Sequence, residues 1–125
     1  MAIYDYKYEH FTDFIKKQNK ENYLEGIKVV EDYLGKEYHL VINGEIITTE
    51  NKYTSRNPAI HTEVIGEISQ ASIEHAEKAI TIAHETFNTW KNSLPQMRAD
   101  ILLKSAGIIR RRKFEFAALM TKEAG

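Results

Sequence analysis

The chain has 125 residues and a formal net charge of −1, from 17 Lys and Arg against 18 Asp and Glu. This balance argues against a partner recognised by bulk charge, such as nucleic acid or an acidic membrane. Without cysteine, the chain has no disulfide, no thiolate metal site and no thiol nucleophile. The start Met1-Ala2-Ile3-Tyr4-Asp5 does not resemble a secretory signal, and the apolar runs are far shorter than a bilayer span. We therefore expect a cytoplasmic protein.

Residues 1–36 are predicted to form an aromatic N-terminal arm followed by a helix. The aromatic residues of the arm are Tyr4, Tyr6, Tyr8, Phe11 and Phe14. The helix is expected at about 19–34, with Asn19 as its N-cap and Gly35 ending it in a left-handed conformation. Its predicted apolar face repeats at steps of four, three and four: Tyr23, Ile27, Val30 and Leu34.

Residues 37–70 are predicted to be β structure. A hairpin is expected at about 39–49, because Asn43-Gly44 is a favoured type I′ pair between two β-prone runs. Short strands are expected at about 53–56, halted by Pro58, and at about 63–69. Gly66 inside the last strand suggests a bulge or the close approach of another backbone.

Residues 71–125 are predicted to be three helices, at about 72–91, 95–112 and 114–124. Ser72 is the expected N-cap of the first, Pro95 fits the first turn of the second, and Gly125 fits the C′ position of the third. The apolar stripe of the first helix is Ile73, Ala76, Ile80, Ala83, Phe87 and Trp90. The expected inward face of the second is Met97, Ile101, Leu102, Ser105, Ile108 and Ile109.

These elements supply few partners for so much apolar helix surface. A hairpin is marginal alone, and an isolated one leaves open edges and an uncovered apolar face. The pattern therefore favours a partial domain, a surface layer of a larger α/β enzyme, over an autonomous small fold.

No residue type in the chain forms a recognisable catalytic, cofactor-binding or metal-binding motif, so we assign none. The histidines are expected to be solvated or capping residues: His10, His39, His61, His75 and His84. No glycine spacing matches a phosphate loop or a dinucleotide fingerprint. The carboxylate pairs Glu115 with Glu123 and Glu74 with Glu77 are expected on exposed helix faces, and Trp90 is expected to be a core anchor.

The basic run Arg110-Arg111-Arg112-Lys113 allows two interpretations. It could contact phosphate or nucleic acid. The favoured interpretation is structural, because consecutive helical residues point about 100° apart and cations suit a helix C-terminus.

The collinear order of several short motifs resembles the N-terminal part of the NAD(P)-dependent aldehyde dehydrogenases. These motifs include Val41-Ile42-Asn43-Gly44-Glu45, Asn57-Pro58-Ala59, Glu63-Val64-Ile65-Gly66, Phe87-Asn88-Thr89-Trp90 and Lys122-Glu123-Ala124-Gly125. The motifs Phe11-Thr12-Asp13-Phe14, Tyr33-Leu34-Gly35-Lys36 and Ile108-Ile109-Arg110-Arg111-Arg112-Lys113 are similar to the bacterial 1-pyrroline-5-carboxylate dehydrogenases.

The resemblance implies a parent enzyme of proline degradation that oxidises L-glutamate γ-semialdehyde to L-glutamate with NAD. In that family the cysteine nucleophile and the cofactor-binding strands come later than the end of this chain. Residues 71–125 would then be helices that flank the cofactor domain, and this chain alone would be inactive and bind no NAD. Its expected partner is the rest of the parent enzyme, with possible self-association through exposed apolar helix faces.

Two alternatives remain open. The chain could be a free-standing helical interaction module, which should be monodisperse and melt in one sharp transition. It could also be a basic-helix nucleic-acid binder, whose binding should be salt-sensitive. Because a helix ending on Gly125 lacks the residue that normally completes its cap, we also expect a truncated product, which an intact-mass measurement would test.

Overall fold

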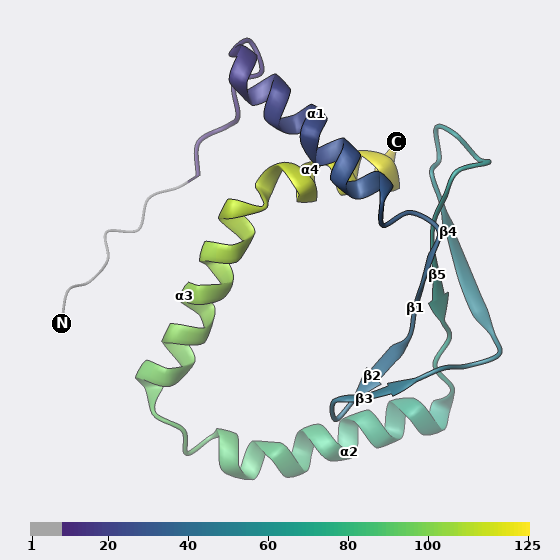
Figure 1. Cartoon of the computed structure of the whole chain (residues 1–125). Coiled ribbons are helices and arrows are strands. Elements are labelled where there is room, and N and C mark those ends of the chain that lie inside the picture. The colour runs from purple at the N-terminus through teal and green to yellow at the C-terminus, as the bar shows by residue number, and fades with distance from the viewer. Residues whose placement is uncertain (1–8) are drawn as a thin grey trace.

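The computed structural model describes residues 9–125, which form an open ring of helices and strands (Figure 1). The helices are α1 (Lys17–Glu31), α2 (Ile73–Trp90), α3 (Pro95–Arg111) and α4 (Lys113–Ala124). The strands are β1 (Lys36–Tyr38), β2 (Leu40–Ile42), β3 (Glu45–Ile47), β4 (Lys52–Arg56) and β5 (Val64–Ser69). The predicted α/β class and the order of its elements are confirmed. The predicted aromatic residues Tyr4, Tyr6 and Tyr8 lie outside the described residues.

The strands form two small sheets. The chain passes from one to the other through His39, which joins β1 to β2. In the first sheet β5 is central, with β1 parallel on one side and β4 antiparallel on the other. The second sheet is the β2–β3 hairpin, with Ile42 paired to Glu45. Its turn residues Asn43 and Gly44 have φ of 54° and 77°, as the predicted type I′ turn requires.

Strand β5 confirms the prediction for Gly66. Ser55 pairs with Gly66 but Arg56 pairs with Val64, so Ile65 is the extra residue of a bulge. A Cβ on Gly66 would also lie 2.8 Å from the ring of Tyr38, so the close approach comes mainly from a side chain.

Helix α1 begins and ends earlier than predicted. Asn19 is not its N-cap: the side-chain amide of Asn19 donates to the carbonyl of Asp13 from within the first turn. At the other end, residues 32–35 form a turn instead of helix. Gly35 has the expected positive φ of 71°, but its N–H donates to Ile65 of β5, so it starts the sheet rather than capping α1.

The other helix ends have the capping and terminal residues expected from the sequence. The Ser72 side chain accepts from the N–H of His75, whose ring in turn accepts from the N–H of Ser72, a reciprocal capping box. Pro95 is the first residue of α3, and Gly125, at φ 95°, ends α4.

The core is small and lies where α1 crosses α4 beside the sheet (Figure 1). Among residues 9–125, the buried hydrophobic side chains of this region are Val30, Ile65 and Ala118, and a fourth, Ile42, lies apart in the β2–β3 hairpin. Gly26 permits the crossing, because a Cβ there would lie 2.7 Å from the Phe114 carbonyl oxygen. Tyr23 and Thr121 extend the contact with a hydroxyl–hydroxyl hydrogen bond of 2.8 Å.

Candidate functional site

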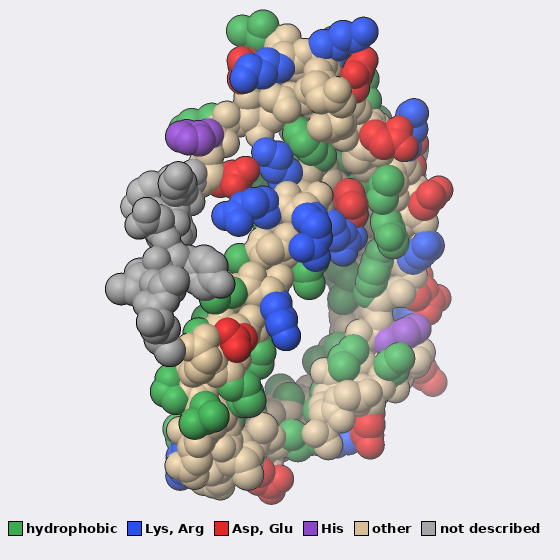
Figure 2. Space-filling model, turned by 60° about the vertical axis from the view of Figure 1, so that its left-hand side comes forward, with side chains coloured by type: hydrophobic (Ala, Val, Ile, Leu, Met, Phe, Trp, Pro, Cys, Tyr) green, Lys and Arg blue, Asp and Glu red, His purple; other side chains and the backbone are tan. Residues whose placement is uncertain are grey.

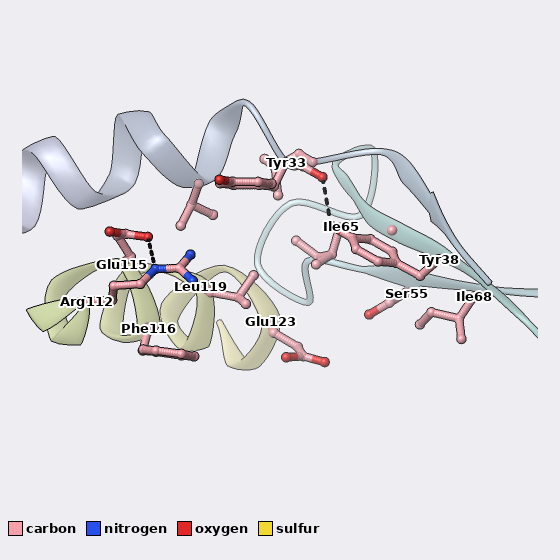
Figure 3. Close-up of a pocket in the computed structure, with 13 residues that line it drawn as sticks. Tyr33, Tyr38, Ser55, Ile65, Ile68, Arg112, Glu115, Phe116, Leu119 and Glu123 are labelled. Carbon is pink, nitrogen blue, oxygen red and sulfur yellow. Dashed lines mark hydrogen bonds and ion pairs between the residues drawn. The ribbon is translucent and has the colours of Figure 1, made fainter. Parts of the chain in front are cut away.

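A pocket of about 340 Å³ lies between the end of α1, the three-stranded sheet and α4 (Figure 3). Its walls are mainly apolar and aromatic, and they include Val30, Tyr33, Leu34, Tyr38, Ile65, Ile68, Phe116 and Leu119. The polar side chains at its border are Ser55, Arg112, Glu115 and Glu123.

The one cation at the border of the pocket, Arg112, is already paired. Arg112 Nε donates to Glu115 Oε2 at 2.8 Å, and the carboxylate raises the pKa of Arg112 above its ordinary value. The predicted exposed position of Glu115 is wrong, since it is half-buried here, whereas Glu123 is exposed at the border. Because the guanidinium is taken and two carboxylates lie nearby, the pocket does not suit the two phosphates of a dinucleotide.

A second polar cluster fixes the loop that contains Asn57-Pro58-Ala59. The Asn57 side chain accepts from the N–H of Ala59 at 2.9 Å and donates to Glu63 Oε2 at 2.6 Å. The other oxygen of Glu63 accepts from Lys122 Nζ of α4 at 2.8 Å. These bonds, from Asn57 first and Lys122 second, hold the pKa of Glu63 below its ordinary value. The cluster therefore ties the β4–β5 connection to the last turn of α4.

The basic run makes intramolecular ion pairs. Arg110 Nε and Lys113 Nζ reach the two oxygens of Glu9, at 3.0 and 3.3 Å. Arg110 and Arg111 lie in the last turn of α3, and Arg112 separates α3 from α4. The structural interpretation of this run is supported by these contacts.

The predicted histidines do not converge. Among the described residues, no three His, Asp or Glu side chains are arranged to hold a metal ion. Of these histidines, His75 has a structural role, because it completes the capping box of α2. In the same part of the chain, no helix is long and apolar enough to cross a bilayer.

Helix α2 has two different faces. Its half-buried residues are His75, Ala79 and Ile82, and Lys78 on this side pairs with Glu45 of the hairpin at 3.1 Å. The predicted apolar stripe lies on another side and is uncovered, with exposed fractions from 43 to 75%. We call its large members the outer stripe: Ile73, Ile80, Phe87 and Trp90. The prediction that Trp90 is a core anchor is wrong for the described chain.

Helix α3 presents an equally uncovered surface. Its large apolar side chains are 43 to 71% exposed. We call the set that spans adjacent turns the apolar arc: Met97, Ile101, Leu102, Ile108 and Ile109. In Figure 2 hydrophobic side chains gather over the α2–α3 corner and around the open centre of the ring. The inward face expected for residues 95–112 has nothing to face within the described chain.

The accessible surface of the chain is also larger than that of a folded monomer of the same mass. Its accessible surface is 10382 Å², whereas a folded monomer of 14.5 kDa exposes about 6,900 Å². Residues 1–8 contribute at most about 1,500 Å² when fully extended. An excess of about 2,000 Å² therefore belongs to the described residues, a size typical of obligate interfaces.

Comparisons with known proteins agree on one family. Residues 46–125 match the model of the aldehyde dehydrogenase family. The chain is 58% identical to 1-pyrroline-5-carboxylate dehydrogenase of Bacillus cytotoxicus and 57% identical to that of Bacillus thuringiensis. Both matches cover 96% of this chain but 23% of the relative. The chain thus spans under a quarter of the length of these curated relatives.

Solved structures give the same result. A mutant of Thermus thermophilus 1-pyrroline-5-carboxylate dehydrogenase superimposes with a TM-score of 0.92 at 31% identity. The match covers 98% of this chain and 24% of that structure. The NAD-bound enzyme from Thermus gives 0.88 at 32% identity, over 94% of this chain and 23% of that structure. The fold is that of the N-terminal part of an aldehyde dehydrogenase.

Proposed function

Because this chain belongs to the aldehyde dehydrogenase family, we propose that it is the N-terminal part of a cytoplasmic 1-pyrroline-5-carboxylate dehydrogenase of proline degradation. The whole enzyme would oxidise L-glutamate γ-semialdehyde to L-glutamate with NAD. The observation that carries this proposal is the match along almost the entire chain to relatives of that one activity.

The role proposed for this part is structural. Residues 1–36 and 37–70 would supply the arm, first helix and strands, and residues 71–125 the helices that flank the cofactor domain. The chain has no cysteine to attack an aldehyde, and its pocket does not suit a dinucleotide. NAD would be held by the rest of the enzyme, so the chain alone is expected to bind no cofactor and to produce no NADH.

A chimera tests the proposal. This chain replaces the matching 120 residues of the Bacillus cytotoxicus enzyme, and NADH formation is followed with 1-pyrroline-5-carboxylate. Activity within about fivefold of the parent, a loss of about 1 kcal/mol in transition-state stabilisation, is the expected result. A soluble, folded chimera without activity would refute the proposal. The 125-residue chain by itself serves as the inactive control.

A further inference from the structure

We infer that this chain reassembles with a separate polypeptide, the remaining three-quarters of a 1-pyrroline-5-carboxylate dehydrogenase, and that it docks through the outer stripe of α2 and the apolar arc of α3. The inference rests on the proposed function, and it adds that a covalent connection after Gly125 is not needed for the assembly.

Helix α2 is packed on one face and exposed on another. It covers the hairpin with one face and exposes the outer stripe on another. Such a helix is the middle of three layers. The third layer is absent from the described chain. The excess surface of about 2,000 Å² gives that layer enough contact area for a permanent interface.

The shape of the surface favours the remainder of the enzyme over a second copy of this chain. A two-fold dimer needs one self-complementary patch. The outer stripe and the apolar arc instead lie along two separate helices, which meet at a corner of the open ring (Figure 1). The same open arrangement is found within a structure about four times as long, of which this chain covers 24%.

The frame that presents these surfaces is held by contacts within the chain. Lys78 of α2 pairs with Glu45 of the hairpin, and the Ser72 capping box fixes the start of α2. The partner would therefore meet a surface that is partly ordered in advance, which lowers the entropic cost of association.

The experiment starts from the folded chimera described above, with a protease site inserted directly after Gly125. After cleavage, size-exclusion chromatography and NADH formation report whether the two chains remain together and functional. We expect them to co-elute with activity within about threefold of the uncut chimera. Phe87→Asp should make the cleaved chains separate and lower activity at least about tenfold, because it places a charge in the apolar interface.

Two further variants keep the result interpretable. Thr81→Asp adds the same charge to an exposed position of α2 outside the outer stripe and should behave like the unmodified chimera. Ile80→Ala removes apolar volume without charge and should make the cleaved chains separate at a lower dilution, even if Phe87→Asp fails to fold.

Separation of the unmodified cleaved chains overturns the inference, and so does elution of this chain as a homodimer apart from its partner. Equal effects of Phe87→Asp and Thr81→Asp overturn the assigned docking surface. If the uncut chimera is active and the cut one is not, only the inference fails. If the uncut chimera is inactive, the proposed function fails as well.

Discussion

The α1–α4–sheet corner and the α2–α3 side of the ring have similar sequence patterns but opposite surroundings. In the corner, Val30, Ile65 and Ala118 are buried and Gly26 touches the Phe114 backbone. On the other side, α2 and α3 contain no buried residue, although each carries apolar side chains at helical spacing. Amphipathic periodicity therefore identifies the face that is to be buried, but not the molecule that buries it.

The difference also separates two kinds of stability. The corner stabilises itself, because its partners lie within the chain. The α2–α3 side packs within the chain only where α2 meets the hairpin, so its helices also rely on local signals such as the Ser72 capping box and Pro95. The following four predictions, on the 125-residue chain, test this contrast.

Matched isoleucine truncations should give the largest difference. Ile65→Ala in the corner should cost about 2 kcal/mol of unfolding free energy or more, the low end for a residue that borders a pocket. Ile80→Ala, at a residue 70% exposed, should change it by no more than about 0.5 kcal/mol. Denaturant unfolding of both variants measures the difference. Equal losses would mean that the corner is not the core.

Matched glycine substitutions should give changes of opposite sign. Gly26→Ala must move the Phe114 backbone, only 2.7 Å from the added methyl, and should cost about 1–3 kcal/mol. Gly107→Ala meets only the flexible Arg111 side chain at 3.7 Å and should stabilise α3 by about 0.5–1 kcal/mol. Thermal melting followed by circular dichroism gives both signs. Stabilisation by Gly26→Ala would show that α1 and α4 do not cross closely.

Acid should weaken the corner through Glu63. The folded-state pKa of Glu63 is below its ordinary value, so its contribution is complete above about pH 4.5 and is lost as pH falls through the folded pKa. Unfolding midpoints between about pH 7 and pH 3 should fall more steeply for the unmodified chain than for Glu63→Gln. Glu77→Gln, on α2, controls for the loss of one charge. A slope unchanged by Glu63→Gln would contradict the bonds to Asn57 and Lys122.

The smallest effect is expected where Glu9 joins Arg110 and Lys113. All three side chains are more than a third exposed, so solvent screens the pairs. Glu9→Gln should lower stability slightly at low salt and not at all at about 1 M salt, where the screening length is about 3 Å. A salt-independent loss would indicate a packing role for this segment.

The elements with local signals could be predicted from the sequence. Asn43-Gly44 fixed the hairpin turn, Ser72 and Pro95 fixed two helix starts, and Gly66 marked the bulge. Each signal depends on neighbours within a few residues, where side-chain chemistry constrains the backbone directly. The stripe of α2 was also predicted correctly as a pattern, although its burial was not.

The features that were missed depend on residues far apart in the chain. Strand β1 has only three residues, two of them charged, and exists because β5 pairs with it in parallel. The pocket, the Gly26 contact with Phe114 and the Glu63–Lys122 pair each join segments separated by tens of residues. The one available signal was Gly26 within a predicted helix, which costs stability unless a close neighbour requires it.

The two faces of α2 have a consequence for synthesis on the ribosome. In the Bacillus cytotoxicus relative, the matching 120 residues are 23% of the protein, so about 400 residues follow them. At about 5–20 residues per second, that part takes roughly 20–80 seconds to translate. During this interval the outer stripe of α2 would be outside the exit tunnel, while the part of the enzyme that covers it is still being made. A nascent chain stalled after these 125 residues should bind a ribosome-associated chaperone more strongly than its Phe87→Asp counterpart. Crosslinking to the chaperone measures the difference.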